Sequence, residues 1–486
     1  MSAELTDRDR IRLVLKDKPY LPVLLVSAFS LVCAVLIWFG TYKNLGIYIL
    51  PVIIAIPMVL AFIRYPRLWL YVVVISTIFY FRDSSDDISA TDVIIALLYY
   101  GTLIPWLFWQ VLIKRQKIVQ CLGDWFVIAY YILMLLNSFI AVLNGVSLLD
   151  WFREYLIMSA ILFYFPLIRY FNEKKYLIRL LIVFSVVTLG IDLFQFYDYY
   201  RIAMQNLIYA YQMQSSTRIN LTFYTVASAV GVIFALFQKK ITYQFLLVLL
   251  VALTVGALGI TFARTFWLIL FIEIVVIFIF VGKKQKFRLS VYITLISIIF
   301  TVGLFSVFKD NTTILLNLME KRIVSSTEGT ADISIVARLY EYEKVWEKIY
   351  ENPLGGNGLA KKFHFYNPIY EYTQYTHYTH NGYFFMFYKA GLPLSFFFLF
   401  PLIYFIFISF NLTRKIKDNF YRMIALSALV IIITLIVANF SSTQFISRDG
   451  PFVLAYGYAF AGIALMFYKK ELAENNHVIH NSVQEK

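Results

Sequence analysis

The sequence predicts an all-α protein that crosses a membrane many times and carries one large loop outside it. Of the 486 residues, 60% are hydrophobic and 15% are charged, whereas soluble globular chains are about 45–50% apolar and about 25% charged. The apolar residues are also grouped into long stretches. This composition excludes a soluble enzyme and a disordered chain. The two cysteines, Cys33 and Cys121, offer neither a disulfide framework nor a metal cage.

Apolar stretches of membrane-spanning length recur along the chain. A transmembrane helix needs about 20 mostly apolar residues, because the hydrocarbon layer is about 30 Å thick. We predict 12–14 such helices, and the stretches are residues 20–39, 46–63, 67–81, 91–113, 124–143, 150–168, 176–197, 218–237, 243–261, 265–281, 289–308, 381–409, 421–438 and 451–468. The stretch 381–409 contains Pro393, which predicts a tilt or a kink in that helix.

Basic residues predict how these helices are oriented. Lys and Arg number 43 against 29 Asp and Glu, and most of the excess lies in every second connection. The basic clusters are residues 8–18, 64–67, 114–117, 169–179, 239–240, 283–288, 414–417 and 469–470. Because basic connections stay in the cytoplasm, both termini are predicted to be cytoplasmic. The first apolar stretch lacks a small-residue cleavage site, so we interpret it as a retained anchor.

The alternation divides the chain into successive parts. A cytoplasmic segment, 1–19, precedes transmembrane helices 1–11 in residues 20–308, and helices 12–14 in 381–468 precede a cytoplasmic tail, 469–486. Between the two groups, residues 309–380 form a large extracytoplasmic loop in which we expect amphipathic helices. Function in membrane proteins is often carried by such loops and by charges within the membrane.

The loop begins its recognisable part with an amphipathic helix and a glycine-rich turn. Residues 334–351 place apolar side chains three or four positions apart, which is typical of one buried helix face. These side chains are Ile335, Leu339, Tyr342, Trp346 and Ile349. Asn352-Pro353 ends the helix. The turn 355–358 follows, and the amides of Gly356 and Gly358 are candidates to bind an anion, although a plain loop is the commoner structure for a short glycine-rich run.

Three of the five histidines fall in this loop, at His364, His377 and His380. His377 and His380 have a spacing that one helix turn can bring together, but only Glu371 lies near them in sequence, so we predict no metal site. Single histidines are more often structural than catalytic. His380, at the mouth of a predicted span and beside Asn381, is a stronger candidate than usual for a general base near neutral pH.

Several arginines lie on the predicted outer side, where the charge rule disfavours them. Arg264 opens the tenth span and Arg338 lies in the amphipathic helix, while Arg218 opens the eighth span and Arg153 precedes Glu154 in the sixth. Snorkelling to lipid headgroups is one explanation. The other is a diphosphate partner, because the guanidinium fork makes paired hydrogen bonds to phosphate oxygens and stays charged.

Together these residues resemble the O-antigen ligase and O-antigen polymerase superfamily of bacterial membrane glycosyltransferases. The family shows an outer-helix Arg, an aromatic residue, a segment like Asn-Pro-Leu-x-Gly-x-Gly and a His-Asn pair at the next span. The matching residues here are Arg338, Tyr342, 352–358, His380-Asn381, the small-residue-then-Arg pair Ala263-Arg264 and, more loosely, the Arg-led segment 218–223. Tyr342 stands where a Trp is common. The resemblance covers roughly residues 218–410.

The resemblance implies a GT-C-like helical enzyme of the inner membrane. Its donor would be a glycan on a polyprenyl diphosphate, such as undecaprenyl diphosphate, at the extracytoplasmic face. A ligase transfers that glycan to lipid A–core in lipopolysaccharide, and a polymerase transfers it to another lipid-linked repeat of an O-antigen, capsule or exopolysaccharide. We slightly favour a polymerase. The implied partners are the donor, the acceptor glycan, membrane lipids and polysaccharide-assembly proteins, with no nucleic acid, metal or other cofactor.

The same resemblance assigns roles to the residues. Arg264 and Arg338 would bind the diphosphate with help from Arg218, and His380 would accept the proton of the attacking hydroxyl. Asn381 or His377 would orient His380 or the acceptor. From their place on the predicted outer side and in the glycine-rich turn, we expect Arg153, Gly356 and Gly358 to be further substrate contacts.

Two other functions remain open from the sequence. A lipid-linked glycan flippase or another transporter would also be basic and many-spanned, but it would carry more charges at mid-span than Asp192 and Glu273. A non-catalytic scaffold for glycan assembly would tolerate changes at Arg338 and His380.

Overall fold

A computed structural model describes residues 64–80, 90–203, 221–308, 333–447 and 449–484, together with isolated positions between 309 and 332. The predicted segment 1–19, the spans 20–39 and 46–63, and Arg218 lie outside the described residues. The chain divides into two compact units, one of residues 1–69 with 88–106 and one of residues 70–87 with 107–486. Every residue of the candidate site belongs to the second unit.

Long apolar helices form most of the described chain, as the composition predicts. The earlier helices are α4 (Pro66–Tyr80), α5 (Ala90–Phe108) with a π-helical continuation (Trp109–Ile113), α6 (Leu122–Leu143), α7 (Leu148–Ser159), a 3₁₀ turn (Ala160–Phe163), α8 (Tyr164–Phe171) and α9 (Lys174–Ala203). The later ones are α12 (Leu221–Phe237), α13 (Ile241–Gly259), α14 (Arg264–Phe280), α15 (Lys283–Phe308), α17 (Ile333–Glu351), α18 (Gly382–Lys415), α19 (Asn419–Ala438) and α20 (Gly450–Gln484).

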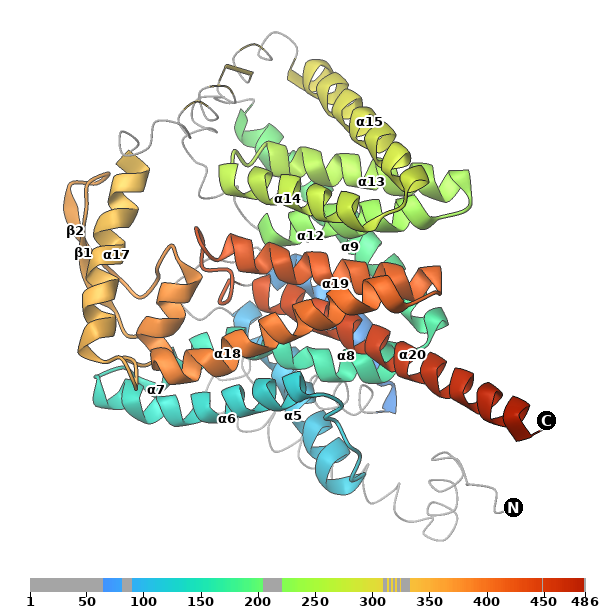
Figure 1. The fold of residues 1–486 in the computed structure, drawn as a ribbon. Coiled ribbons are helices and arrows are strands. Elements are labelled where there is room, and N and C mark those ends of the chain that lie inside the picture. The colour runs from blue at the N-terminus through green and yellow to red at the C-terminus, as the bar shows by residue number, and fades with distance from the viewer. Residues whose placement is uncertain are drawn as a thin grey trace, which may run out of the picture. The chain divides into compact units, whose positions relative to one another are not determined.

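Within the described residues, eight helical segments are long and apolar enough to cross a membrane, and α12 is a shorter apolar helix. This confirms the prediction of an all-α, multi-pass membrane protein. In the second unit α18, α19 and α20 pack against one another, with α6 against α18 and α12 against α13 and α19 (Figure 1). Backbone groups in lipid must be paired within the segment, which is why helices make up the spans.

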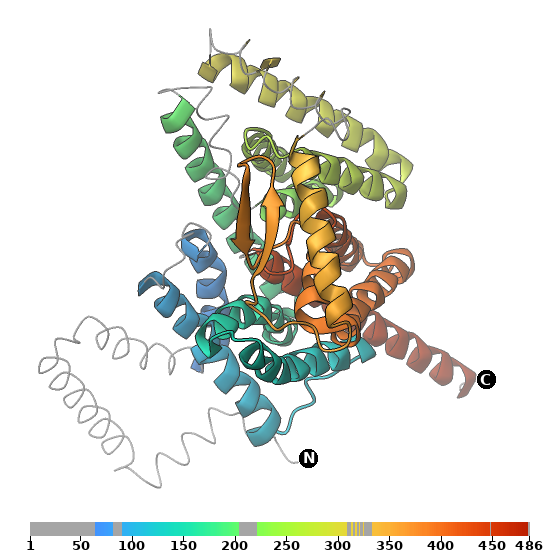
Figure 2. The ribbon, with the colours of Figure 1, turned by 90° about the vertical axis from the view of Figure 1, so that its left-hand side faces the viewer.

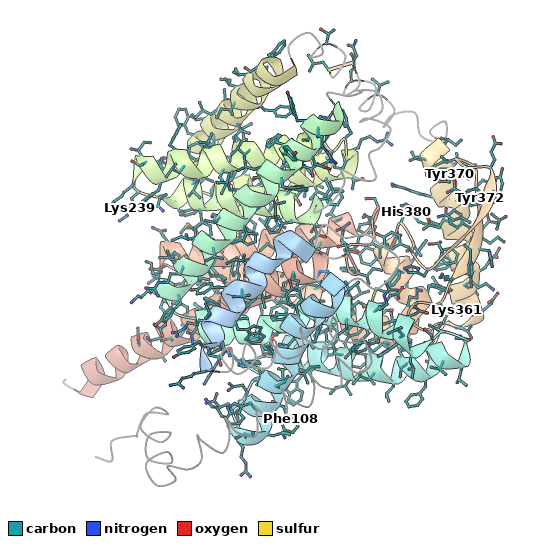
Figure 3. All side chains as sticks on the ribbon, turned by 180° about the vertical axis from the view of Figure 1, so that it is seen from behind. Phe108, Lys239, Lys361, Tyr370, Tyr372 and His380 are labelled. Atoms are coloured by element: carbon teal, nitrogen blue, oxygen red, sulfur yellow. The ribbon has the colours of Figure 1, made fainter. Side chains whose placement is uncertain are left out.

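The connections of the second unit meet at two opposite ends of its helices. At one end the basic connections contact each other, through Lys174 with the ring of Phe420 and through Arg422 with the carbonyl of Phe280. At the other end, the connections that are poor in Lys and Arg contact each other and the large loop. The contacts are Asn144 with Asn357, Gly382 with Asn439 and Phe223 with Asp449. Figure 3 shows Lys239 and His380 on opposite sides of the view. Basic connections and connections poor in Lys and Arg therefore lie at opposite ends of the helices, as the basic clusters predict. That the basic end is cytoplasmic stays a prediction.

Helix α17 and a two-stranded hairpin lie in the described part of the loop. Strands β1 (Phe363–Asn367) and β2 (Tyr372–Thr376) pair antiparallel and lie beside α17 (Figure 2). The hairpin was not among the predictions, which gave only helices for this loop. Its buried side packs on α17 and α18 through a cluster of Val345, Ile349, Phe363, Phe365 and Tyr388.

This packing corrects the predicted apolar stripe of the outer helix. The buried positions of α17 are Ala337, Glu341, Val345 and Ile349, four residues apart. Leu339 and Trp346, which the periodicity assigned to the buried face, are 51% and 46% exposed. The buried face of α17 differs from the predicted one because α17 packs against the hairpin, which lies later in the chain.

Helix α18 is interrupted at Gly391, two residues before Pro393. Gly391 has φ 77° and ψ 166°, a conformation that suits glycine. The break exposes backbone groups, and the loop after α17 pairs with them, since the amide of Leu392 donates to Pro353 O at 2.8 Å. A Cβ on Gly356 would lie 2.4 Å from the nitrogen of Gly391. The predicted kink is present, and its site is the glycine that meets this loop rather than the proline.

Candidate active site

His380 lies in the short connection between β2 and α18. Asn381 caps α18, because its Oδ1 accepts hydrogen bonds from the amides of Tyr383 at 2.9 Å and Phe384 at 3.1 Å. The other end of the same side chain donates to Phe440 O at 3.3 Å. Asn381 therefore fixes where the helix begins, and with it the position of the neighbouring histidine.

The connection 439–449, between α19 and α20, holds this segment from the other side. The amide of Gly382 donates to Asn439 O at 2.8 Å, and Thr443 donates through its hydroxyl to the carbonyl of Thr379. Thr379 and Asn439 are fully buried. A Cβ on Gly382 would overlap the side chain of Asn439, so this position requires glycine. The backbone on both sides of His380 is thus fixed by packing.

Glu341 of α17 binds His380 twice. Its Oε1 accepts the backbone amide of His380, and its Oε2 lies against ring atom Nδ1, both at 2.6 Å. The carboxylate side chain is 2% exposed and the imidazole is 49% exposed. A carboxylate only accepts hydrogen bonds, so we assign the proton to Nδ1 and the lone pair to Nε2. The pair has the geometry of an oriented general base.

Arg338 lies one turn before Glu341 on the same helix, so both project from neighbouring positions of one face. Its side chain is half-buried. Burial raises the pKa of Tyr342, while the charge of Arg338 and a hydrogen bond with Asn381 oppose that rise. The ring of Tyr342 packs edge-on against Phe384 at 5.2 Å. The structure therefore gathers Arg338, Tyr342, His380 and Asn381 around the start of α18.

Arg264 opens α14 after a tight turn formed by residues 261–263. Phe262 is buried with φ 54°, and the hydroxyl of Thr261 accepts the amide of Ala263 at 3.3 Å. Glu273 of α14 contacts Thr434 late in α19, and Phe280 at the end of α14 contacts Arg422 early in α19, so the two helices run in opposite directions. Arg264 therefore lies at the same end of the bundle as the connection 439–449 that supports His380.

His377 has a carboxylate of its own, at a greater distance. Its Nε2 lies 3.6 Å from Oε1 of Glu154 on α7, the residue that follows Arg153. Oε2 of Glu154 accepts the amide of Ala360 at 2.6 Å and lies 4.0 Å from Nζ of Lys389. Lys389 is fully buried and donates to Lys361 O at 2.6 Å. This group of side chains joins α7, the loop and α18.

The amides of the glycine-rich turn already have protein acceptors. Those of Asn357 and Gly358 donate to Tyr388 O at 2.8 Å and Lys389 O at 2.9 Å, and that of Gly356 donates to Asn352 O at 3.1 Å. The acceptors at 388 and 389 are the carbonyls that the break in α18 leaves without helical partners. The turn therefore completes α18, and the expected anion contact at Gly356 and Gly358 gives way to this structural role.

The loop histidines are held apart by different partners. His364 stacks on Tyr375 in the hairpin, with ring centroids 4.2 Å apart, while His377 and His380 contact different glutamates. Among the described residues there is no group of three or more His, Cys, Asp and Glu side chains that could hold a metal ion.

Glu341 is the main site residue that the sequence did not reveal. It is separated from His380 by 39 positions, so their contact depends on the tertiary fold. One signal was present in the sequence, because a carboxylate beside the family-like Arg338 and Tyr342 is an expensive group to bury unless it is paired. Lys389 was missed for a similar reason, since it lies within an aromatic stretch with no local partner.

Part of the chain that contains these residues matches a known family. Residues 247–399 match the family model described as O-Antigen ligase. This domain belongs to the O-antigen ligase/polymerase superfamily. The match contains Arg264, Arg338, Glu341 and His380. No curated protein matches the chain. The family consists of ligase- and polymerase-type enzymes that act on glycans. The matched residues therefore indicate a ligase- or polymerase-type function in glycan assembly, and the long apolar helices indicate a multi-pass membrane protein.

Proposed function

We propose that the protein is a metal-independent glycosyltransferase that transfers or polymerises glycan from a polyprenyl-diphosphate donor. The reaction would take place at the extracytoplasmic face of a bacterial inner membrane, with both chain termini in the cytoplasm, during synthesis of a surface polysaccharide. The observation that carries the proposal is the Glu341–His380 pair beside Arg338, inside the residues that match the family. An oriented imidazole next to a guanidinium suits deprotonation of an alcohol beside an anionic leaving group.

In the proposed reaction the acceptor hydroxyl attacks the anomeric carbon of the donor. The new bond joins the acceptor oxygen to that carbon, and the bond from the carbon to the diphosphate oxygen breaks. The bonding electrons leave with the polyprenyl diphosphate, and the hydroxyl proton moves to Nε2 of His380. Glu341 then stabilises the imidazolium through the hydrogen bond to Nδ1, in the same way that a carboxylate orients the histidine of a catalytic triad.

The arginines would stabilise the leaving group. Arg264 and Arg338 offer guanidinium forks for the two phosphates, and Arg218 is a third candidate. Their charge would offset the negative charge that builds on the diphosphate in the transition state, which is the part that a metal ion plays in other enzymes. We assign Arg153 and His377, which flank Glu154, to the glycan, and we assign a positioning role to Asn381.

Purified protein in lipid nanodiscs tests this function directly. Lipid-linked glycans extracted from cells that lack the gene would serve as the substrate. We expect consumption of the donor and a new glycosidic linkage, with equal activity in the presence of EDTA. A change of leaflet without a new linkage would instead identify a flippase, and loss of activity in EDTA would contradict the metal-independent mechanism.

The deletion strain distinguishes a polymerase from a ligase. We slightly favour the polymerase, which predicts that long surface chains disappear from gels while a single capped repeat remains. If the protein is a ligase, its deletion should leave no capped product at all, and lipid-linked chains should accumulate in the membrane. Transfer to lipid A–core would identify the acceptor in that case.

A further inference from the structure

The hairpin presents a row of aromatic rings on the side opposite its buried face. Along β1, Phe363, Phe365 and Asn367 are buried and the residues between them are exposed. In the strand register His364 pairs with Tyr375, and their rings stack at 4.2 Å with an interplanar angle of 17°. We call His364, Tyr366 and Tyr375 of the hairpin, with Tyr340 of α17, the aromatic platform.

The rings of the platform are ordered by each other and remain open to solvent. Tyr340 contacts Tyr366 edge-on at 5.9 Å, which extends the row from the hairpin to α17. Tyr340, Tyr366 and Tyr375 are 44%, 45% and 56% exposed. Rigid aromatic side chains lose little conformational entropy on binding, so exposed rings that are already stacked are well suited to a ligand.

The platform is continuous with the candidate active site. Strand β2 ends at Thr376, His377 follows directly, and His380 lies three residues further on. On the other strand, Lys361 just before β1 donates to Asn144 O at 2.7 Å and accepts from Lys389. Figure 3 shows His380 between the bundle and the hairpin, with Tyr370 and Tyr372 at the outer edge of the hairpin. A chain bound along the hairpin would therefore lead towards His380.

The chemistry of the surface favours a glycan over the membrane. Pyranose rings offer C–H faces that stack on aromatic rings and hydroxyl edges that hydrogen-bond to phenols, imidazoles and ammonium groups. Lys362 lies over the ring of Tyr375 at 5.5 Å. The exposed side of α17 carries the ion pairs Lys344–Glu347 at 2.8 Å and Lys348–Glu351 at 2.7 Å, and burying such charges in hydrocarbon is costly.

We propose that the aromatic platform binds the polysaccharide chain of the substrate, several sugar units away from the reacting end. This role rests on the proposed glycosyl transfer and adds a binding site for longer glycans. It predicts that affinity rises with the number of repeat units until the platform is filled. It also predicts that products lengthen efficiently only while the platform is intact.

The test uses the full-length protein in nanodiscs and the surface polysaccharide of the source strain. The polysaccharide is released by mild acid and separated into fractions from one to about ten repeats. Binding is measured by saturation-transfer NMR and microscale thermophoresis for the parental protein, for the double variant Tyr366→Ala/Tyr375→Ala and for Tyr243→Ala. Tyr243 is a matched control because it is 49% exposed on α13, near the basic end of the bundle.

We expect the double variant to bind long fractions roughly tenfold more weakly, since two stacking contacts are removed, and to give shorter products. Transfer between single-repeat substrates should stay within about twofold of the parental rate. Equal binding and equal product lengths in the double variant would overturn the platform while leaving the transferase proposal intact. If the parental protein binds long glycans but transfers none, the transferase proposal fails instead. If the double variant no longer binds vesicles of phosphatidylethanolamine and phosphatidylglycerol but binds glycans as the parental protein does, the platform is a membrane-contact surface and the proposal is overturned.

Discussion

His377 and His380 lie three residues apart in the loop, and each contacts a glutamate in a different way. Both carboxylate oxygens of Glu341 contact His380, one at the backbone amide and one at Nδ1, each at 2.6 Å, and the Glu341 side chain is buried. In Glu154, Oε2 accepts the amide of Ala360 and lies 4.0 Å from Nζ of Lys389, while Oε1 lies 3.6 Å from Nε2 of His377. The first carboxylate orients an imidazole, whereas the second joins segments of the protein. Residue type alone therefore does not distinguish the two histidines, and their carboxylate contacts do.

Alanine variants of the two histidines should show the largest difference in activity between the two pairs. We expect His380→Ala to lower kcat by about 10³-fold or more, because general-base assistance contributes about 10²–10⁴-fold. His377→Ala should act mainly on KM for the acceptor, by less than about tenfold. Steady-state transfer rates, measured at equal amounts of folded protein, check both values. Near-parental transfer by His380→Ala would remove the role assigned to its imidazole.

The arginines that we propose to bind the diphosphate should give the next largest effect. Arg264→Lys and Arg338→Lys keep the charge and lose the fork, and we expect each to reduce kcat by about 10²-fold, within the range for loss of one oxyanion donor. Arg179→Lys is a matched control, because Arg179 is exposed near the basic end of α9. If both site variants turn over at the rate of the control, paired hydrogen bonds to the diphosphate are not part of catalysis.

Removing the charge of Glu341 tests the orientation argument itself. Glu341→Gln retains the size of the side chain and an acceptor for the His380 amide. It loses the second acceptor that fixes the ring and the charge that stabilises the imidazolium. We expect kcat to fall about 10²-fold with KM nearly unchanged, and the melting temperature to stay close to parental. A fall in melting temperature with kcat preserved would show that Glu341 serves the fold and not the base.

The matching change at the second pair should have the smallest effect on turnover. Glu154→Gln leaves Lys389 buried without its nearby carboxylate, so we expect a loss of roughly 1–3 kcal/mol in stability. Activity per folded molecule should remain within about threefold. Thermal unfolding in nanodiscs, followed by transfer assays on the folded fraction, separates the two quantities. A large loss of kcat with unchanged stability would place Glu154 in the reaction and contradict the comparison.

Much of the fold followed from the sequence because it depends on local composition. Apolar length predicted the helices, and the alternation of basic connections agrees with the two ends of the bundle. The His380-Asn381 pair at the start of α18 was also found in advance. These features depend on neighbouring residues and on the cost of moving charges through lipid.

The errors came from contacts between distant segments. Glu341 meets His380 across 39 positions, and the hairpin chose which face of α17 to bury. The amides at 356–358 could serve an anion or a carbonyl, and the break in α18 decided between them by supplying carbonyls at Tyr388 and Lys389. Each outcome required knowledge of which segment lies opposite.

The break at Gly391 separates the start of α18, next to His380, from the rest of the helix down to Lys415. The short upper portion is anchored by the loop and by Asn439, so its position does not depend on how the lower portion inclines. We expect bilayers of different thickness to tilt the lower portion while the portion next to His380 keeps its position. Such an articulated helix would let the enzyme keep one working geometry as the lipid around it changes.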